Sequence, residues 1–332
     1  MRRAAVLALC VGLALPAAAQ QAPGETYVLI VTGVGGEAHY SRMFHEWAIA
    51  FGDAARDRHG VSPEHITYLG ENTQRAPDRI ADRSTREVVE RELTRLARLA
   101  RAGDRVLVVL FGHGAGSGPE SRFNLPGPDL TAAEWAALLG RFSGPTVGLV
   151  NAASASGDFV AALSGERRII ITATKSAQER NEARFGRFFV DAFARDVADV
   201  DKDGRVSLLE AFDYARREVA RTYEEEGALL TEHAQLDDDG DGTGTAAPDG
   251  LSGDGRLARA FHLNSTARVI AGADPRLRAL YEEKQAIETR LDELRRRKDS
   301  LSAADYEQRL EDLLVALAEK NLAIRELEAR RP

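Results

Sequence analysis

The chain has 332 residues, a formal net charge of −8 and 44% hydrophobic residues, which is typical of a globular protein with one α/β domain and an additional segment. The acidic balance argues against nucleic acid as the main partner, because phosphate contacts need a basic surface.

The N-terminal residues 1–19 have the pattern of a secretory signal peptide. Two arginines precede an apolar run, Ala4–Ala19, which ends in three alanines before Gln20, as at a signal-peptidase site. The single cysteine, Cys10, lies inside this run, so the mature protein would contain no disulfide and no thiol nucleophile. We therefore expect a periplasmic or secreted protein, with no integral membrane segment after signal cleavage.

Residues 25–270 alternate between strand-like and helix-like patterns. Because the strands are almost entirely apolar, they suit burial on both faces of a sheet, and the alternation predicts a mainly parallel sheet flanked by helices. Thr131 and Glu134 have capping-box spacing at one helix start, and the Asp- and Gly-rich segment Gly227–Gly255 is expected to be a loop. Strands are expected at Tyr27–Thr32, Ile66–Leu69, Val106–Phe111, Thr146–Val150 and Arg168–Thr172. Helices are expected at Tyr40–Arg58, Thr85–Ala102, Thr131–Leu139, Arg184–Arg195 and Leu208–Tyr223.

From Pro275 the composition changes to mainly Glu, Arg, Lys, Leu and Ala. Leucine or isoleucine recurs every seven residues in two runs, Leu280–Leu301 and Leu310–Ile324. This pattern predicts an antiparallel helical hairpin or a coiled coil over residues 275–332. The pattern leaves open whether the apolar seam closes within one chain or between chains, so self-association through 275–332 is one of the expected roles.

Two strand ends carry the candidate catalytic residues. His113 directly follows strand 106–111, and the neighbouring Gly114 allows the backbone to approach a substrate closely. The next strand ends in a segment of small residues, Asn151–Gly157, which contains Ser154. Because reactive groups gather at the carboxyl ends of parallel strands, we expect the imidazole to face this short loop.

These motifs make residues 1–220 similar to the caspase-fold peptidases, most closely the legumain-like branch. The resemblance rests on VLIVTG with Tyr40 at the first strand exit, His-Gly-Ala-Gly at 113–116, and the small-residue-Ser-Gly element at 152–157. It implies that His113 occupies the position of the dyad histidine and that Gly114 donates a backbone N–H to the oxyanion.

The cysteine of that dyad is absent from this sequence. Alignment on the Ser-Gly pair at 156–157 puts Ser154 in the nucleophile position, whereas alignment on the strand end puts Ala153 there. A serine hydroxyl needs strong activation by a positioned base, and no acidic residue nearby in sequence is an obvious partner for the imidazole.

Three functions therefore compete. The first is a non-catalytic peptidase homologue that binds a peptide or protein, and the second is a serine-type hydrolase with a His113–Ser154 dyad. The third is a scaffold that calcium rigidifies and the C-terminal helices oligomerise. Arg42 lies roughly where legumain-like enzymes hold a substrate-pocket arginine, and Glu179 follows the fifth strand. Both are candidates for substrate binding, and both equally fit solvated surface charges.

Residues 199–210 match the EF-hand loop pattern D-x-[DN]-x-[DN]-G-x5-E at every specified position. Alternate carboxylates can turn inward, Gly204 permits the sharp bend, and the final glutamate can supply two oxygens. This segment therefore predicts a Ca²⁺ site. The expected ligands are Asp199, Asp201, Asp203, the Arg205 carbonyl, Ser207 and Glu210.

A second acidic segment repeats the opening of such a loop, with Asp237, Asp239 and Asp241 at the first three ligand positions. Its twelfth position is Pro248, which cannot bind a metal through its side chain. The segment is either a weaker second calcium loop or a turn-rich linker.

Overall fold

The computed structural model describes residues 24–195, 197–200, 204–251, 253–263, 275–297 and 300–329. The expected signal peptide, Asp201 and Asp203 lie outside the described residues. Seven strands form the main sheet, in the order β10-β9-β8-β4-β1-β2-β3. All pair in parallel except β10, which is antiparallel to β9. The strands are β1 (Thr26–Thr32), β2 (Ile66–Gly70), β3 (Asp82–Arg83), β4 (Arg105–Phe111), β8 (Thr146–Asn151), β9 (Arg168–Thr172) and β10 (Gln235–Asp237).

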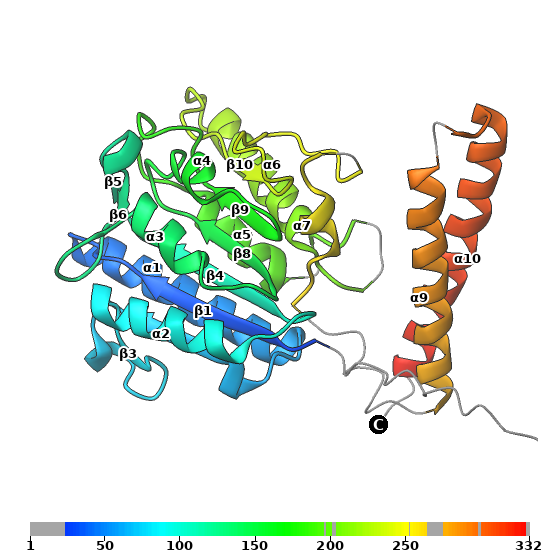
Figure 1. The fold of residues 1–332 in the computed structure, drawn as a ribbon, viewed down its shortest axis with the longest axis horizontal. Helices are drawn as coiled ribbons and strands as arrows, with labels where there is room; N and C mark the ends of the chain where they lie inside the picture. The colour runs from blue at the N-terminus through cyan, green and yellow to red at the C-terminus, as the bar shows by residue number, and fades with distance from the viewer. Residues whose placement is uncertain are drawn as a thin grey trace, which may run out of the picture.

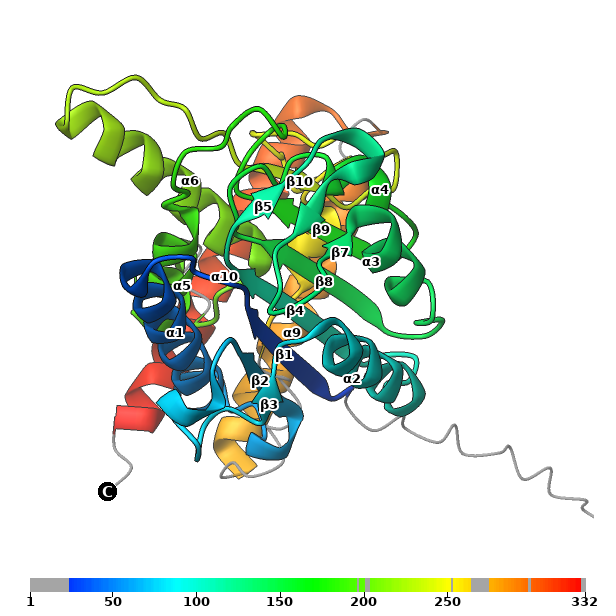
Figure 2. The same cartoon turned by 90° about the vertical axis from the view of Figure 1, so that its left-hand side faces the viewer.

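Helices cover both faces of this sheet. Figure 2 shows α1, α5 and α6 on one side and α2, α3 and α4 on the other, which confirms the predicted α/β class. Their bounds are α1 (Ala38–Asp53), α2 (Arg86–Leu99), α3 (Ala132–Leu139), α4 (Phe159–Leu163), α5 (Phe185–Ala194), α6 (Leu208–Glu225) and the short α7 (Arg256–Ala260). A π-helical turn follows α1 at Ala54–Arg58, and single 3-10 turns occur at Pro63–His65, Thr73–Arg75 and Gly118–Glu120.

Burial on both faces explains why the central strands carry no polar alternation. Every residue of Val106–Phe111 in β4 is buried. Along β1, Val28 and Ile30 pack under α1 and α5, whereas Leu29 and Val31 pack under α2 and α3. Fully burying one such aliphatic side chain contributes roughly 1.5–3 kcal/mol, so the two apolar layers fix the sheet between the helices.

The predicted capping box at the start of α3 is confirmed. The Thr131 hydroxyl accepts the backbone N–H of Glu134, and the Glu134 carboxylate accepts the backbone N–H of Thr131 at 2.8 Å. Arg86 of α2 forms an ion pair with the same carboxylate. The cap therefore also ties α2 to α3 on one face of the sheet.

Three parts of the sheet structure were not predicted from the sequence, and the first is the edge strand β3. The segment expected to be a loop, Gly227–Gly255, contains β10, and a second sheet of three short antiparallel strands follows β4. These strands have only two or three residues each, too few to show the period of two that identifies a strand. The second sheet consists of β5 (Gly114–Ala115), β6 (Arg122–Phe123) and β7 (Leu130–Thr131).

The C-terminal part contains two long helices, α9 (Pro275–Arg296) and α10 (Ala303–Ala329). Figure 1 shows them side by side and running in opposite directions. Leu277 of α9 and Ile324 of α10 are buried together. None of the helices in the described ranges is both long and apolar enough to span a membrane.

A buried carboxylate holds the start of α5. Glu232 accepts the backbone N–H groups of Arg184 and Phe185, each at 2.8 Å. Burial raises the pKa of Glu232 to about 7, although the two N–H groups act in the opposite direction. The folded protein therefore binds a proton at Glu232 more tightly than the unfolded chain does.

This raised pKa predicts how stability depends on pH. The contribution of Glu232 is fully present below its unfolded pKa, near 4.5, and is lost as the pH rises through about 7. Between about pH 5 and about pH 8, the wild-type free energy of unfolding should fall by on the order of 1–3 kcal/mol more than that of Glu232→Gln. Urea unfolding followed by circular dichroism measures this difference. The exposed Glu166→Gln is the control and should keep the wild-type profile, whereas parallel pH profiles for wild type and Glu232→Gln would contradict the prediction.

Candidate functional site

The ends of β4 and β8 lie next to each other in the sheet. The two strands pair in parallel with Leu110 opposite Asn151, so the segments that follow them leave the same edge. A Cβ atom added to Gly114 would lie 2.4 Å from the backbone oxygen of Ser154. The structure therefore brings the His113–Gly114 segment and the Ser154 loop into contact, and the close approach requires glycine at position 114.

The ring of His113 is half-buried among aromatic side chains of α1. Tyr40 meets it edge-on with ring centroids 4.8 Å apart, and the Phe44 ring centroid lies at 5.1 Å. Burial lowers the pKa of His113, and a hydrogen bond with the backbone of Gly35 acts in the opposite direction. Because the pKa lies below its ordinary value of 6.5, the neutral imidazole predominates near neutral pH.

The acidic residue that acts on His113 electrostatically is Glu182, on the segment after β9. Its carboxylate accepts the hydroxyl of Tyr40 at 3.3 Å, and this negative charge raises the pKa of Tyr40. Within the described ranges, no carboxylate hydrogen-bonds to the His113 ring. The arrangement therefore lacks the buried acid that orients the imidazole in a serine-hydrolase triad.

Ser154 and Ala153 differ in their surroundings. Ser154 is 4% exposed, and no hydrogen bond joins it to His113 in the described part of the chain. Ala153 packs in the cluster under α2 and α3, on the opposite side of the sheet from the aromatic contacts of His113. Ala155, which follows Ser154, has a φ of +53°, and its N–H donates to the Glu179 carbonyl at 2.7 Å.

The two predicted substrate-binding residues lie in different settings. Arg42 is exposed on α1, and it is two positions from both Tyr40 and Phe44, so it faces away from the ring contacts of His113. The Glu179 side chain is 10% exposed and accepts the backbone N–H of His233 at 3.1 Å. Its carboxylate thus holds neighbouring segments together, and its carbonyl supports the Ser154 loop.

A pocket of about 390 Å³ is connected to the surroundings of His113 through Glu182. Glu182 lines this pocket and also accepts the hydroxyl of Tyr40, which contacts the His113 ring. Arg184 forms a two-point ion pair with Glu226 at 2.8 Å and stacks over the Tyr223 ring at 4.5 Å. Glu182 was not among the candidate residues predicted from the sequence, because its partner Tyr40 lies on α1, far away in the chain. The pocket is lined by Asn181, Glu182, Arg184, Tyr223, Ala228, Leu229 and Thr231.

The first and last positions of the EF-hand-like loop both bind the loop backbone. Asp199 accepts the N–H of Gly204 at 3.0 Å, and Gly204 has a φ of +82°. Glu210 accepts the N–H of Val200 through one oxygen and the N–H of Ser207 through the other, each at 2.9 Å. Arg205 between them is half-buried. These bonds close the ends of the loop, and its Ca²⁺ site stays a prediction, because Asp201 and Asp203 lie outside the described residues.

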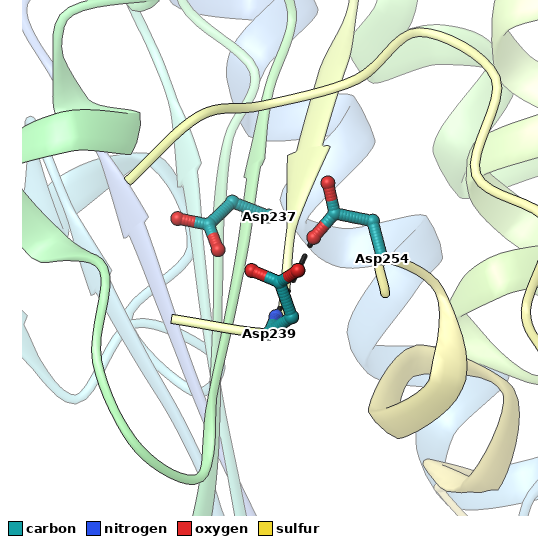
Figure 3. A group of neighbouring side chains, drawn as sticks. All are labelled: Asp237, Asp239 and Asp254. Carbon is teal, nitrogen blue, oxygen red and sulfur yellow. Dashed lines mark hydrogen bonds between the residues drawn. The ribbon is translucent and has the colours of Figure 1, made fainter. Parts of the chain in front are cut away.

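The second acidic segment is arranged differently from the predicted EF-hand order. Asp237, Asp239 and Asp254 each place one carboxylate oxygen so that the three oxygens lie within 4.8 Å of one another (Figure 3). The side chain of the predicted Asp241 instead accepts the N–H of Thr243 at 2.6 Å and closes its own turn. Burial and the charges of Asp239 and Asp237 raise the pKa of Asp254 to about 6. Sequence spacing missed Asp254 because it lies outside the twelve-residue window of a single loop.

Comparisons with known proteins give little further information. No family model matches the chain, and a search of curated proteins found no similar sequence. Among solved structures, the chain is similar to protein GSU0716 from Geobacter sulfurreducens, a Northeast Structural Genomics target. The two share 15% sequence identity, with a TM-score of 0.39 over 64% of this chain and 92% of that chain. A similarity of this size carries no functional argument, so function has to be inferred from the residues of this chain.

Proposed function

We propose that this chain is an exported, caspase-like peptidase homologue that binds a peptide or protein segment at the His113 edge without cleaving it. The observation that best supports this proposal is the environment of His113. Its ring contacts Tyr40 and Phe44 and bonds to the backbone of Gly35. Without a carboxylate behind it, the imidazole lacks the partner that stabilises an imidazolium during serine attack.

The charges around the neighbouring pocket favour a basic side chain in the bound segment. Glu226 compensates the charge of Arg184 through the two-point ion pair. Glu182 is exposed, and the partner found for its carboxylate is the neutral hydroxyl of Tyr40. The pocket rim therefore carries an excess negative charge, which complements a lysine or arginine of a ligand.

Peptide binding with charge-matched controls tests this proposal. Fluorescein-labelled peptides with a central lysine should bind more tightly than the same peptides with glutamate, measured by fluorescence anisotropy. Glu182→Gln should weaken binding of the lysine peptides about 1.5- to fivefold, the scale of one exposed ion pair. Glu166→Gln makes the same charge change before β9 and should leave binding unchanged. Equal binding of both peptide classes would contradict the proposal.

The turn after Ser154 favours serine hydrolysis as a second candidate function. Ala155 is in the left-handed region, where a residue other than glycine costs on the order of 1–3 kcal/mol and often marks a functional site. Gly114, next to His113, lies against the Ser154 backbone, so the two segments that carry the dyad residues are in contact.

A fluorophosphonate probe distinguishes binding from hydrolysis. We expect no covalent labelling of the wild-type chain between about pH 6 and about pH 9, because no base among the described residues is bonded to the Ser154 hydroxyl. In-gel fluorescence and intact mass measure the labelling, with Ser156→Ala as the control for a neighbouring serine. Labelling that disappears in Ser154→Ala and remains in Ser156→Ala would establish the hydrolase instead.

We include a Ca²⁺ ion at the loop 199–210 in the proposal. This loop leads into α6, a helix that contributes to the pocket. Ser207 is the N-cap of α6, and Glu210 completes its capping box. Tyr223 lies near the other end of the same helix and lines the pocket that Glu182 also lines. An ion bound by Asp199 and Glu210 would therefore stiffen a helix that forms one wall of that pocket.

Exposed apolar residues on α10 favour self-association as an additional role. Leu314, Val315 and Leu322 are 45%, 53% and 59% exposed. Their spacing of seven or eight residues puts Leu322 on the same side of the helix as the other two. An apolar stripe of this kind fits a second copy of the hairpin better than solvent.

Light scattering after size-exclusion chromatography tests that role. The wild-type chain should have at least twice the mass of one chain, because the stripe buries its apolar side chains between copies. Leu314→Glu should shift the mass toward one chain, whereas the control Glu319→Gln on the same helix should not. A wild-type chain that elutes as a monomer at high concentration would contradict self-association.

A further inference from the structure

Asp237 is a buried carboxylate with an unused oxygen. It ends β10, is 1% exposed, and its Oδ1 accepts the N–H of Gly240 at 3.2 Å. Among the described residues, its Oδ2 has no hydrogen-bond partner. Burying an anionic oxygen without a partner is costly, so this atom calls for a ligand that carries positive charge.

Asp239 and Asp254 repeat the same arrangement around Asp237. Asp239 accepts the N–H of Asp241 through Oδ1 at 3.0 Å, and Asp254 accepts the N–H of Asp238 through Oδ1 at 2.9 Å. Figure 3 shows the Asp239 carboxylate between those of Asp237 and Asp254. Within the described ranges, none of the three forms an ion pair. Asp254 Oδ1 also accepts the N–H of Asp239 at 3.4 Å, so the oxygen left both buried and unpartnered in this group is Oδ2 of Asp237.

We propose that Asp237, Asp239 and Asp254 form a Ca²⁺ site that is separate from the loop 199–210 and draws its ligands from two segments of the chain. The spacing fits one ion. Bonds of about 2.3–2.6 Å allow two oxygens on the same Ca²⁺ to lie up to about 5 Å apart, and the three oxygens lie within 4.8 Å of one another.

The chemistry of the donors favours Ca²⁺ over other common ions. All three ligands are carboxylates, which suit hard cations rather than zinc or copper. Mg²⁺ requires shorter bonds and near-octahedral geometry, and an irregular loop with one ligand from a different segment satisfies that requirement poorly. Backbone carbonyls and water would complete the coordination.

The ion would fasten a segment that supports the first calcium loop. Asp238, next to two of the ligands, accepts the N–H groups of Gly255 and Ala258 and thereby holds the start of α7. The chain then leaves α7 at Phe261, whose carbonyl accepts the N–H of Leu208 at 3.0 Å. Through this helix, the second site would stabilise the start of α6, where Ser207 and Glu210 lie.

Calcium stoichiometry of the full chain tests this proposal. Isothermal titration calorimetry on EGTA-treated protein should show two bound ions for the wild type and one for Asp237→Asn. Asp239 is exposed, so Asp239→Asn should fold like the wild type. This variant should bind Ca²⁺ at the proposed site at least tenfold more weakly than the wild type does. Asp241→Asn is the matched control and should keep both ions, and an equal concentration of Mg²⁺ should not displace them.

The variant Glu210→Gln separates the two calcium sites. It should lose the ion of the loop 199–210 and keep the ion that Asp239→Asn loses. In another outcome, the wild type binds a single ion that Asp239→Asn loses and Glu210→Gln keeps. That result would support the site at Asp237, Asp239 and Asp254 and contradict the site at the loop 199–210. Three results would overturn the proposal: undiminished calcium binding in a folded Asp239→Asn, equal losses in Asp241→Asn and Asp239→Asn, or displacement by equimolar Mg²⁺.

Discussion

The parallel pairing of β4 with β8 is the constraint on which the rest of the molecule depends. Because both strands are buried on both faces, their backbone groups can be satisfied only by neighbouring strands. The pairing fixes where each chain leaves the sheet, and Gly114 then meets the Ser154 carbonyl. The contact between these two segments is therefore a consequence of core packing, and it does not by itself supply catalytic chemistry.

Backbone groups perform much of the positioning that charged side chains perform in a hydrolase. His113 is held by the backbone of Gly35 and by aromatic rings, and the Ser154 turn is held by the Glu179 carbonyl. The start of α5, by contrast, is held by a side chain, the buried carboxylate of Glu232. The contacts around His113 orient the imidazole but supply no carboxylate that would stabilise an imidazolium, which agrees with the proposed binding without cleavage.

Acidic side chains cluster at two places, the loop 199–210 and the group of Asp237, Asp239 and Asp254. Carboxylates a few ångströms apart repel one another strongly where solvent is scarce, and a divalent cation removes that repulsion. The bridge between Ser207 and His262 joins the two regions. The acidic clusters would therefore act as fasteners for α6 and α7, which lie on the same side of the sheet as the aromatic surroundings of His113.

The sequence by itself determined the elements with strong periodic or apolar signals. The five predicted strands, the capping box of Thr131 and the two C-terminal helices are local features, since hydrophobic period and capping chemistry act over a few residues. The tertiary structure alone decided β10, the three-strand sheet, the Tyr40–Glu182 contact and the exchange of Asp241 for Asp254. The short strands carry too few residues to show a period of two, and the Tyr40–Glu182 and Asp237–Asp254 contacts join residues from different segments. Side chains of these types have many other uses, and only packing selects among them.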